Sequence, residues 1–114
     1  MKDNLFLLKP GFSKGEIGPF YCSDSVAVEG MLSFFPPLRA ALDIHYIDFP
    51  RPRDALIALL GEEQQSAPVL IISHDRAIKD AKVIPGVANG RRFLNDERAI
   101  RDYLSSQYNV PRTS

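Results

Sequence analysis

The stretch Pro19-Phe20-Tyr21-Cys22-Ser23-Asp24-Ser25 holds the one cysteine of the chain and lies between two apolar segments. Upstream, Asn4 to Leu8 is an apolar run without alternation, which is typical of a strand buried on both faces. Residues 10–21 are rich in glycine and proline and are predicted to form a loop. Downstream, Ser23 or Asp24 can cap the helix that follows. The stretch therefore predicts a thiol at the turn between a strand and a helix.

Strand-like and helix-like segments alternate along the rest of the chain. Residues 44–49 and 69–72 are rich in β-branched and aromatic side chains, so both are predicted strands. Between them, residues 53–60 fit a helix that a glycine ends. Its inward-facing side chains are predicted to be Ala55, Leu56, Leu59 and Leu60. Residues 91–94 and 97–108 fit a fourth strand and a last helix.

Two segments are less regular. Pro36-Pro37 interrupts the first helix, because each proline removes an amide donor, and residues 38–42 are predicted to form a short helical piece. Residues 73–90 form a long connection, which inside a compact domain is usually functional, mobile or partly structured. The predictions for this connection are helical turns at 76–81, an extended piece at 82–84, and turns at Pro85-Gly86 and Asn89-Gly90.

The order of these elements, β-α-β-α-β-β-α, predicts a single α/β domain over residues 1–114. Consecutive β-α-β units imply parallel strands with right-handed crossovers. The third and fourth strands are adjacent in the sequence and can pair antiparallel. The expected architecture is a four-stranded mixed sheet flanked by helices.

The composition is that of a globular protein, with 45% hydrophobic and 25% charged residues. Its 14 basic and 14 acidic residues give no net charge, which argues against nucleic-acid binding. Asp48, Arg51 and Arg53 are predicted to form a solvated rim. One cysteine and two histidines disfavour a zinc site, so no metal is expected. The first residues, Met1-Lys2-Asp3-Asn4, lack the apolar stretch of a signal peptide, and every apolar run of the chain, Val69 to Ile72 included, is too short to cross a membrane. We therefore expect a cytoplasmic protein without membrane contact.

Three short motifs lie where the predicted strands meet helices. Tyr21-Cys22-Ser23-Asp24-Ser25 resembles the C-x-x-S variant of the C-x-x-C motif. Ala67-Pro68-Val69-Leu70-Ile71 resembles a segment that keeps a cis proline beside an active site. Residues 90–104 resemble the pattern G-x-x-L-x-E-S-x-A-I-x-x-Y-L of glutathione transferases. With these motifs the chain is similar to the thioredoxin-like superfamily, in its glutaredoxin and transferase N-terminal form, and to a bacterial thioredoxin-like family without an assigned activity.

The resemblance implies a thiol chemistry linked to glutathione. It makes Cys22 the nucleophile, and it makes Ser25, in place of a second cysteine, a residue that tunes the sulfur through a hydrogen bond. Ala67, ahead of a cis Pro68, would pair its backbone with an extended peptide such as glutathione. The other ligand-binding residues that the resemblance implies are Lys9, Tyr21, Asn95 and Asp96. It further implies that glutathione or a thiol or disulfide substrate is the partner, that no cofactor is bound, and that the protein is a homodimer.

The chain departs from that family in three places. The loop between Lys9 and Cys22 is longer than in glutaredoxins, and residues 73–90 replace a tight hairpin. The helical second domain of the transferases is not expected after Ser114. Ordinary transferase activity is therefore not expected.

Two functions follow from the motifs. The first is a glutathione-dependent monothiol thiol–disulfide oxidoreductase, because a helix N-terminus stabilises a thiolate, although Asp24 opposes this effect. Serine cannot resolve a mixed disulfide, so the cycle needs an external thiol. The alternative is a non-catalytic thioredoxin-like module for a peptide or protein partner, with Cys22 as a small apolar residue and Asp96 as an ordinary helix cap. Iron–sulfur carriage is disfavoured, because Ser23-Asp24 does not match the loop of monothiol glutaredoxins.

Overall fold

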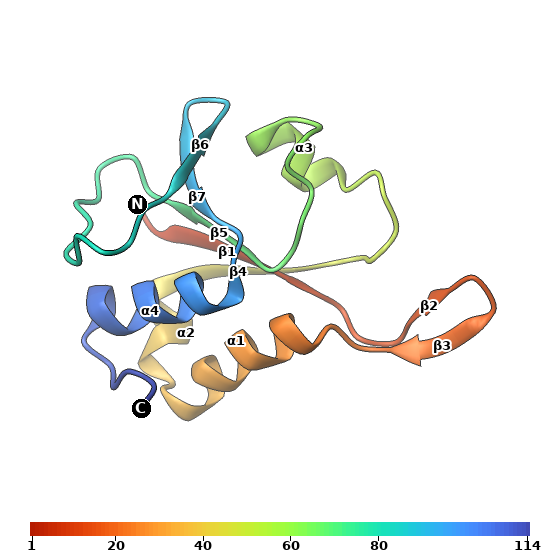
Figure 1. The fold of residues 1–114 in the computed structure, drawn as a ribbon, viewed down its shortest axis with the longest axis horizontal. Helices are drawn as coiled ribbons and strands as arrows, with labels where there is room; N and C mark the ends of the chain where they lie inside the picture. The colour runs from red at the N-terminus through yellow and green to blue at the C-terminus, as the bar shows by residue number, and fades with distance from the viewer.

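The computed structural model describes residues 1–114 and has a mixed β-sheet at its centre (Figure 1). Its strands are β1 (Asp3–Leu8), β4 (Leu42–Ile47), β5 (Val69–Ile72), β6 (Gly86–Ala88) and β7 (Arg91–Leu94). They lie in the order β4-β1-β5-β7-β6, with β1 parallel to β4 and every other pair antiparallel. The mixed α/β architecture is confirmed, but the sheet has five strands instead of the predicted four.

Helices cover both faces of the sheet. α1 (Ser23–Phe34), α2 (Pro37–Ala41) and α4 (Glu97–Tyr108) lie on one face, and α3 (Asp54–Leu60) lies on the other (Figure 1). The side chains of β1 alternate between these two layers. Leu5 and Leu7 pack in the cluster that includes residues of α1 and α4, whereas Phe6 packs in the cluster that includes residues of α3. The prediction that this strand is buried on both faces is therefore confirmed.

The longest helices, α1 and α4, have 12 residues each, and no helix is long and apolar enough to cross a membrane. α4 has the bounds predicted from the sequence, because local signals fix both of its ends. Asp96 accepts a hydrogen bond from the amide of Ala99 at its start. At its end Asn109 adopts the left-handed conformation, with a φ of 57°.

Two predictions for the other elements are wrong, one on a strand boundary and one on a buried residue. β4 begins at Leu42 and ends at Ile47, where the sequence predicted a strand over residues 44–49. Leu42, predicted to end the short helical piece, pairs with Asp3 of β1 instead, so α2 ends at Ala41. On α3, Ala55 is exposed instead of facing inward, because Leu56 and Leu60, four residues apart, define its buried stripe.

Residues 12–20 form a hairpin arm instead of the predicted loop. β2 (Phe12–Lys14) and β3 (Ile17–Phe20) pair antiparallel and project away from the body of the molecule (Figure 1). The turn between them contains Gly15 with a φ of 62°, which favours glycine. At the base of the arm the ring of Phe12 stacks on that of Phe49, with 4.2 Å between the ring centroids. This stack anchors a two-stranded unit that would otherwise be marginally stable.

The connection over residues 73–90 also differs from its prediction. Residues 76–81 form no helix and residues 82–84 form no strand. The fifth strand, β6, pairs with β7 instead through a turn at Asn89 and Gly90, whose φ angles of 50° and 73° suit an Asn-Gly hairpin. The Asn89-Gly90 turn is thus confirmed, whereas Gly86 lies within β6 and not in a turn. It leaves room for the ring of Phe93, because a Cβ at Gly86 would lie 2.8 Å from it.

Candidate functional site

Cys22 itself caps α1. Its backbone is extended, and its Sγ accepts a hydrogen bond from the amide of Ser25 at 3.4 Å. The prediction that Ser23 or Asp24 caps this helix is therefore wrong, and both residues lie in the first turn. The arrangement places the sulfur against the amide groups at the positive end of the helix dipole.

The Ser25 side chain has a structural partner. It is buried, and its Oγ accepts a hydrogen bond from the amide of Leu8 at 3.1 Å. The contact between this residue and the Cys22 sulfur comes from its amide, not from its hydroxyl as predicted. Ser25 thereby ties the first turn of α1 to the last residue of β1 and holds Cys22 in place.

An open apolar cavity of about 270 Å³ adjoins the thiol. Cys22 is partly exposed in its wall. The cavity is lined by Leu7, Leu8, Pro10, Tyr21, Cys22, Ser25, Val26, Glu29 and Tyr46. Of the residues predicted for the site, the structure thus brings Tyr21, Cys22 and Ser25 together. Tyr21 is 64% exposed and leaves the cavity accessible from solvent.

Two residues that line this cavity, Glu29 and Tyr46, form a polar triad with Arg39. The hydroxyl of Tyr46 donates to Glu29 Oε1 at 2.5 Å, and Arg39 donates to the other oxygen of the same carboxylate. Burial and then the hydrogen bond to Glu29 raise the pKa of Tyr46. The sequence analysis missed this triad. The one local signal for the triad was the carboxylate of Glu29 among the apolar residues of α1.

Arg53 is a buried cation whose charge interacts with that of a Cys22 thiolate. It is 8% exposed, and its guanidinium donates to the carbonyl oxygens of Phe49 and Gln65 without a carboxylate partner. Burial and the charge of Arg51 lower the pKa of Arg53, and the negative charge of a Cys22 thiolate opposes them. The prediction that Arg53 belongs to a solvated rim is wrong. Arg53 is buried, and the carbonyl oxygens of Phe49 and Gln65 satisfy its guanidinium there.

Lys9 has its partner outside the Cys22 cavity. Its Nζ lies 3.4 Å from Asp48 Oδ1, and it lines a separate cavity of about 320 Å³ together with Arg53. Lys14 lies on the arm, 5.7 Å above the ring of Phe20. Neither lysine lines the cavity beside the thiol.

The remaining predicted residues gather at the same end of the sheet. The Ala67–Pro68 peptide is cis, as predicted. Ala67 and Pro68 directly precede β5, and Asn95 and Asp96 directly follow β7, which pairs antiparallel with β5. Asn95 donates to Ser66 Oγ at 3.5 Å. These residues lie near the start of β5, but none of them lines the cavity beside Cys22.

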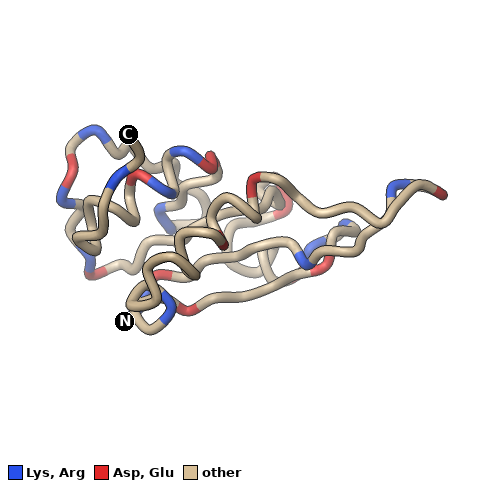
Figure 2. Tube along the Cα trace, turned by 90° about the horizontal axis from the view of Figure 1, so that it is seen from below, with Lys and Arg blue, Asp and Glu red and all other residues tan.

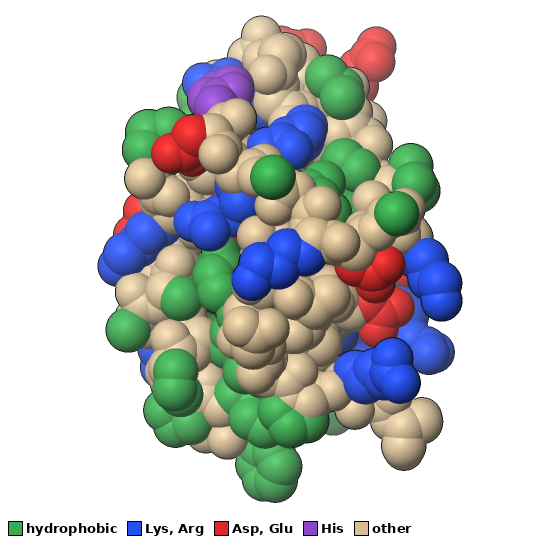
Figure 3. Space-filling view, turned by 90° about the vertical axis from the view of Figure 1, so that its left-hand side faces the viewer, with side chains coloured by type: hydrophobic (Ala, Val, Ile, Leu, Met, Phe, Trp, Pro, Cys, Tyr) green, Lys and Arg blue, Asp and Glu red, His purple; other side chains and the backbone are tan.

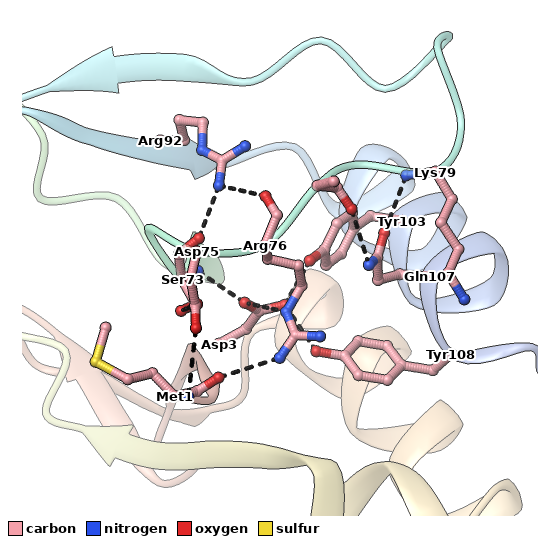
Figure 4. Close-up of polar contacts among 11 residues, drawn as sticks. Met1, Asp3, Ser73, Asp75, Arg76, Lys79, Arg92, Tyr103, Gln107 and Tyr108 are labelled. Atoms are coloured by element: carbon pink, nitrogen blue, oxygen red, sulfur yellow. Dashed lines mark hydrogen bonds and ion pairs between the residues drawn. The ribbon is translucent and has the colours of Figure 1, made fainter.

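A second polar cluster surrounds Asp3 at the start of β1, the end of the strand opposite to Leu8 (Figure 4). Asp3 is fully buried, and its Oδ1 accepts from the amide of Ser73 at 2.8 Å and from Arg76 Nε at 3.2 Å. Its Oδ2 accepts from the hydroxyls of Tyr103 and Tyr108. Burial and then the hydrogen bond to Asp3 raise the pKa of both tyrosines. With four donors, this carboxylate is fully satisfied, and its role is to join β1, the 73–85 segment and α4.

The segment after Ser73 is fastened by further hydrogen bonds (Figure 4). Arg92 donates to the carbonyl oxygens of Ser73 and Arg76, each at 2.7 Å. Gln107 of α4 accepts from the amide of Lys79 and donates to the carbonyl oxygen of Ala77. The sequence analysis missed this cluster. The available signal was that Asp3 lies in phase with Leu5 and Leu7, on the face of β1 that α1 and α4 cover.

No group of three or more His, Cys, Asp and Glu side chains is arranged to hold a metal ion. His45 stacks on Phe6 with 4.5 Å between ring centroids, and its Nε2 lies 2.8 Å from Asn4 Oδ1. Both contacts are structural.

Residues 2–112 match the family model described as "Protein of unknown function (DUF3088)", and the chain belongs to this family. Comparison with curated proteins finds no match. Comparison with solved structures finds none either.

Proposed function

We propose that this chain is a thioredoxin-like protein that carries out thiol–disulfide exchange at Cys22, with glutathione as cosubstrate. One observation carries the proposal: Cys22 Sγ caps α1, accepts the amide of Ser25 at 3.4 Å, and opens into an apolar cavity. A sulfur held in this way is favoured as a thiolate and is accessible to a substrate. A lone thiol with this chemistry belongs in a reducing compartment, and the proposal therefore places the protein in the cytoplasm.

The arrangement of strands supports the fold part of the proposal. In the segment β4-β1-β5-β7, one parallel pair is followed by two antiparallel strands. α1 and α4 lie on one face of these strands and α3 on the other. The resemblance to thioredoxin-like proteins predicts this order, with β6 and the hairpin arm as additions.

Electrostatics around the sulfur also support the proposal. The charge of Arg53 interacts with a thiolate at Cys22, and this guanidinium has no carboxylate of its own. Asp24, in the first turn of α1, acts in the opposite direction. The cation is buried whereas the carboxylate is exposed, so solvent screens the carboxylate more strongly.

The proposed cycle has two exchange steps. The Cys22 thiolate attacks the glutathione sulfur of a mixed disulfide, so that a bond between Cys22 and glutathione forms and the substrate leaves as a thiolate that takes a proton from solvent. A second glutathione thiolate then attacks the glutathione sulfur on Cys22. Glutathione disulfide leaves, and the Cys22 thiolate is regenerated. The amide of Ser25 donates to the Cys22 sulfur, whereas the Ser25 hydroxyl, which accepts from the amide of Leu8, takes no part in either step.

The test is the rate at which the protein reacts with a glutathionylated peptide, compared with an unstructured cysteine peptide of matched sequence. We expect exchange at Cys22 to be at least about tenfold faster than in the peptide at pH 7. Mass spectrometry should identify glutathione on Cys22, and the Cys22→Ser variant should show neither exchange nor adduct. A rate equal to that of the peptide would refute the proposal.

A second candidate is the non-catalytic module, and the position of the cavity favours it. The cavity lies between α1 and Tyr46 of β4, whereas Ala67, Pro68, Asn95 and Asp96 do not line it. Asp96 is engaged in capping α4, where it accepts from the amide of Ala99. An apolar side chain of a partner would fit such a cavity. A partner captured equally well by wild-type protein and by Cys22→Ser, together with peptide-like thiol reactivity, would select this function.

A further inference from the structure

A cavity of about 550 Å³ lies on the side of the molecule that carries the C-terminus. Its walls are the 80–84 segment, the outer face of α4 and the tail at 110–113. It shares no residue with the cavity beside Cys22 and has about twice its volume. A volume of this size is in the usual range for small-molecule sites.

The interior of this cavity includes apolar side chains. Val83 is buried in the 80–84 segment, Ala99 lies on α4, and Val110 begins the tail. Ile84, at 78% exposure, adds an uncovered apolar side chain to the same wall. An apolar body seated here would remove these surfaces from water.

The charged side chains of the cavity have a surplus of cations. Lys82, Arg98 and Arg112 line it together with Asp80 and Asp102. Asp80 Oδ1 already accepts from the amide of Lys82 at 2.9 Å. Arg98 Nε lies 3.9 Å from Asp102 Oδ2, beyond hydrogen-bonding distance. The side chains of Lys82, in the 80–84 segment, and Arg112, in the tail, have no ion pair, so one negative charge beside them would balance the charge of the cavity.

The distribution of charge along the chain also favours an anion at this cavity. The chain has no net charge, but residues 73–114 contain eight Lys and Arg against five Asp and Glu. In Figure 2 several Lys and Arg positions lie around the end of the molecule that carries the C-terminus. Figure 3 shows basic side chains spread over the left-hand face of the molecule in Figure 1, with apolar side chains between them. An anion would therefore meet a favourable field on this side.

We propose that this cavity binds an amphipathic monocarboxylate. The carboxylate lies between Lys82 and Arg112, and the apolar body lies over Val83, Ala99 and Val110. A single negative charge matches the surplus of one cation, and an apolar body matches the interior. This binding is independent of the chemistry proposed for Cys22.

Octanoate, octanol and octylamine test the proposal, because they share an apolar body and differ in the charge of the head group. Each is titrated into the isotope-labelled full-length protein while amide shifts are followed by NMR. We expect octanoate to shift the amides of Val83, Ala99 and Val110 in a saturable way, at least about fivefold more tightly than octanol. Octylamine should be weaker still. No saturable shifts with octanoate, or equal binding of all three compounds, would overturn the proposal.

Charge reversal on the two walls provides the second arm of the test. Lys82→Glu and Arg112→Glu should each weaken octanoate binding by about fivefold or more, whereas Lys82→Arg should retain it. Lys14→Glu makes the same change of charge on the distant arm and should leave binding unchanged. Amide spectra confirm that each variant is folded. Unchanged affinity in both wall variants would overturn the proposal. An equal loss in Lys14→Glu would assign the effect to general charge and would overturn it as well.

Discussion

The Oδ2 atom of Asp3 accepts a hydrogen bond of 2.7 Å from the hydroxyl of Tyr108, so the first residue of β1 holds the last residue of α4. The same oxygen accepts from Tyr103, and the other oxygen binds Ser73 and Arg76. Segments that are 70 to 105 residues apart in the sequence are thus joined at one buried carboxylate. Its removal should therefore affect the stability of the whole domain.

Asp3→Asn should lower the free energy of unfolding by about 3 kcal/mol. The amide keeps the shape of the carboxylate but removes the charge that pairs with Arg76 and places an N–H group among buried donors. Urea denaturation followed by circular dichroism measures the change. Asp43→Asn, on the exposed side of β4, is the matched control and should cost less than about 0.5 kcal/mol. Equal effects of the two substitutions would show that Asp3 is not a structural centre.

Alkaline pH should destabilise the fold through the two tyrosines of the same cluster. The folded state raises the pKa of Tyr103 and Tyr108 above the ordinary value of 10.0, chiefly by burial. Their neutral phenols therefore contribute stability that is fully present below about pH 10 and is lost above it, because the unfolded chain releases these protons first. Urea denaturation from pH 8 to pH 11 should show a free energy of unfolding that falls with pH.

Replacing the phenols identifies the source of that fall. Tyr103→Phe and Tyr108→Phe should be less stable at pH 8, but their stability should fall less steeply above pH 10. A slope that is the same in wild type and in both variants would assign the alkaline loss to other groups.

Local sequence signals were enough to predict β1, β5 and α4. An unbroken apolar run defines each strand, and Asp96 and Asn109 define the ends of the helix. The hairpin arm and β6 were not predicted, because their strands have three or four residues and are fixed by pairing with a neighbour and not by their own apolar pattern. Gly86 illustrates this: Pro85-Gly86 indicates a turn, but Gly86 pairs with Phe93 in the sheet, where the Phe93 ring leaves no room for a Cβ.

The candidate site was predictable only in part, for the same reason. The position of Cys22 at a helix start follows from adjacent residues. The burial of Arg53 depends on Gln65, 12 residues away, and the triad beside the cavity joins Glu29 to Tyr46 across 17 residues. Such partners become neighbours only through the fold, and no spacing rule within one helix or strand predicts them.

The junction between β1 and α1 should depend on the Ser25 hydroxyl. Ser25→Ala would leave the buried amide of Leu8 without its acceptor, so we expect a loss of about 1–3 kcal/mol in the free energy of unfolding. Ser23→Ala, on the exposed side of the same helical turn, should change stability by less than about 0.5 kcal/mol. Chemical denaturation of the two variants in parallel makes the comparison. A stable Ser25→Ala protein would mean that water or another group satisfies the Leu8 amide.

The reactivity of Cys22 should depend on Arg53. Arg53→Met removes the buried positive charge but keeps an apolar stem, so the rate of iodoacetamide alkylation at pH 7 should fall by about two- to tenfold. Arg51→Met removes an exposed cation from the same loop and should have a much smaller effect.

The substitution also removes hydrogen bonds to Phe49 and Gln65, so stability must be measured on the same samples. Arg53→Lys separates the two effects, because it retains the charge while losing the forked hydrogen bonds. We expect this variant to be destabilised yet to keep most of the thiol reactivity. If Arg53→Lys and Arg53→Met lose reactivity equally, Arg53 acts on Cys22 by holding the 49–65 segment around α3 and not by its charge.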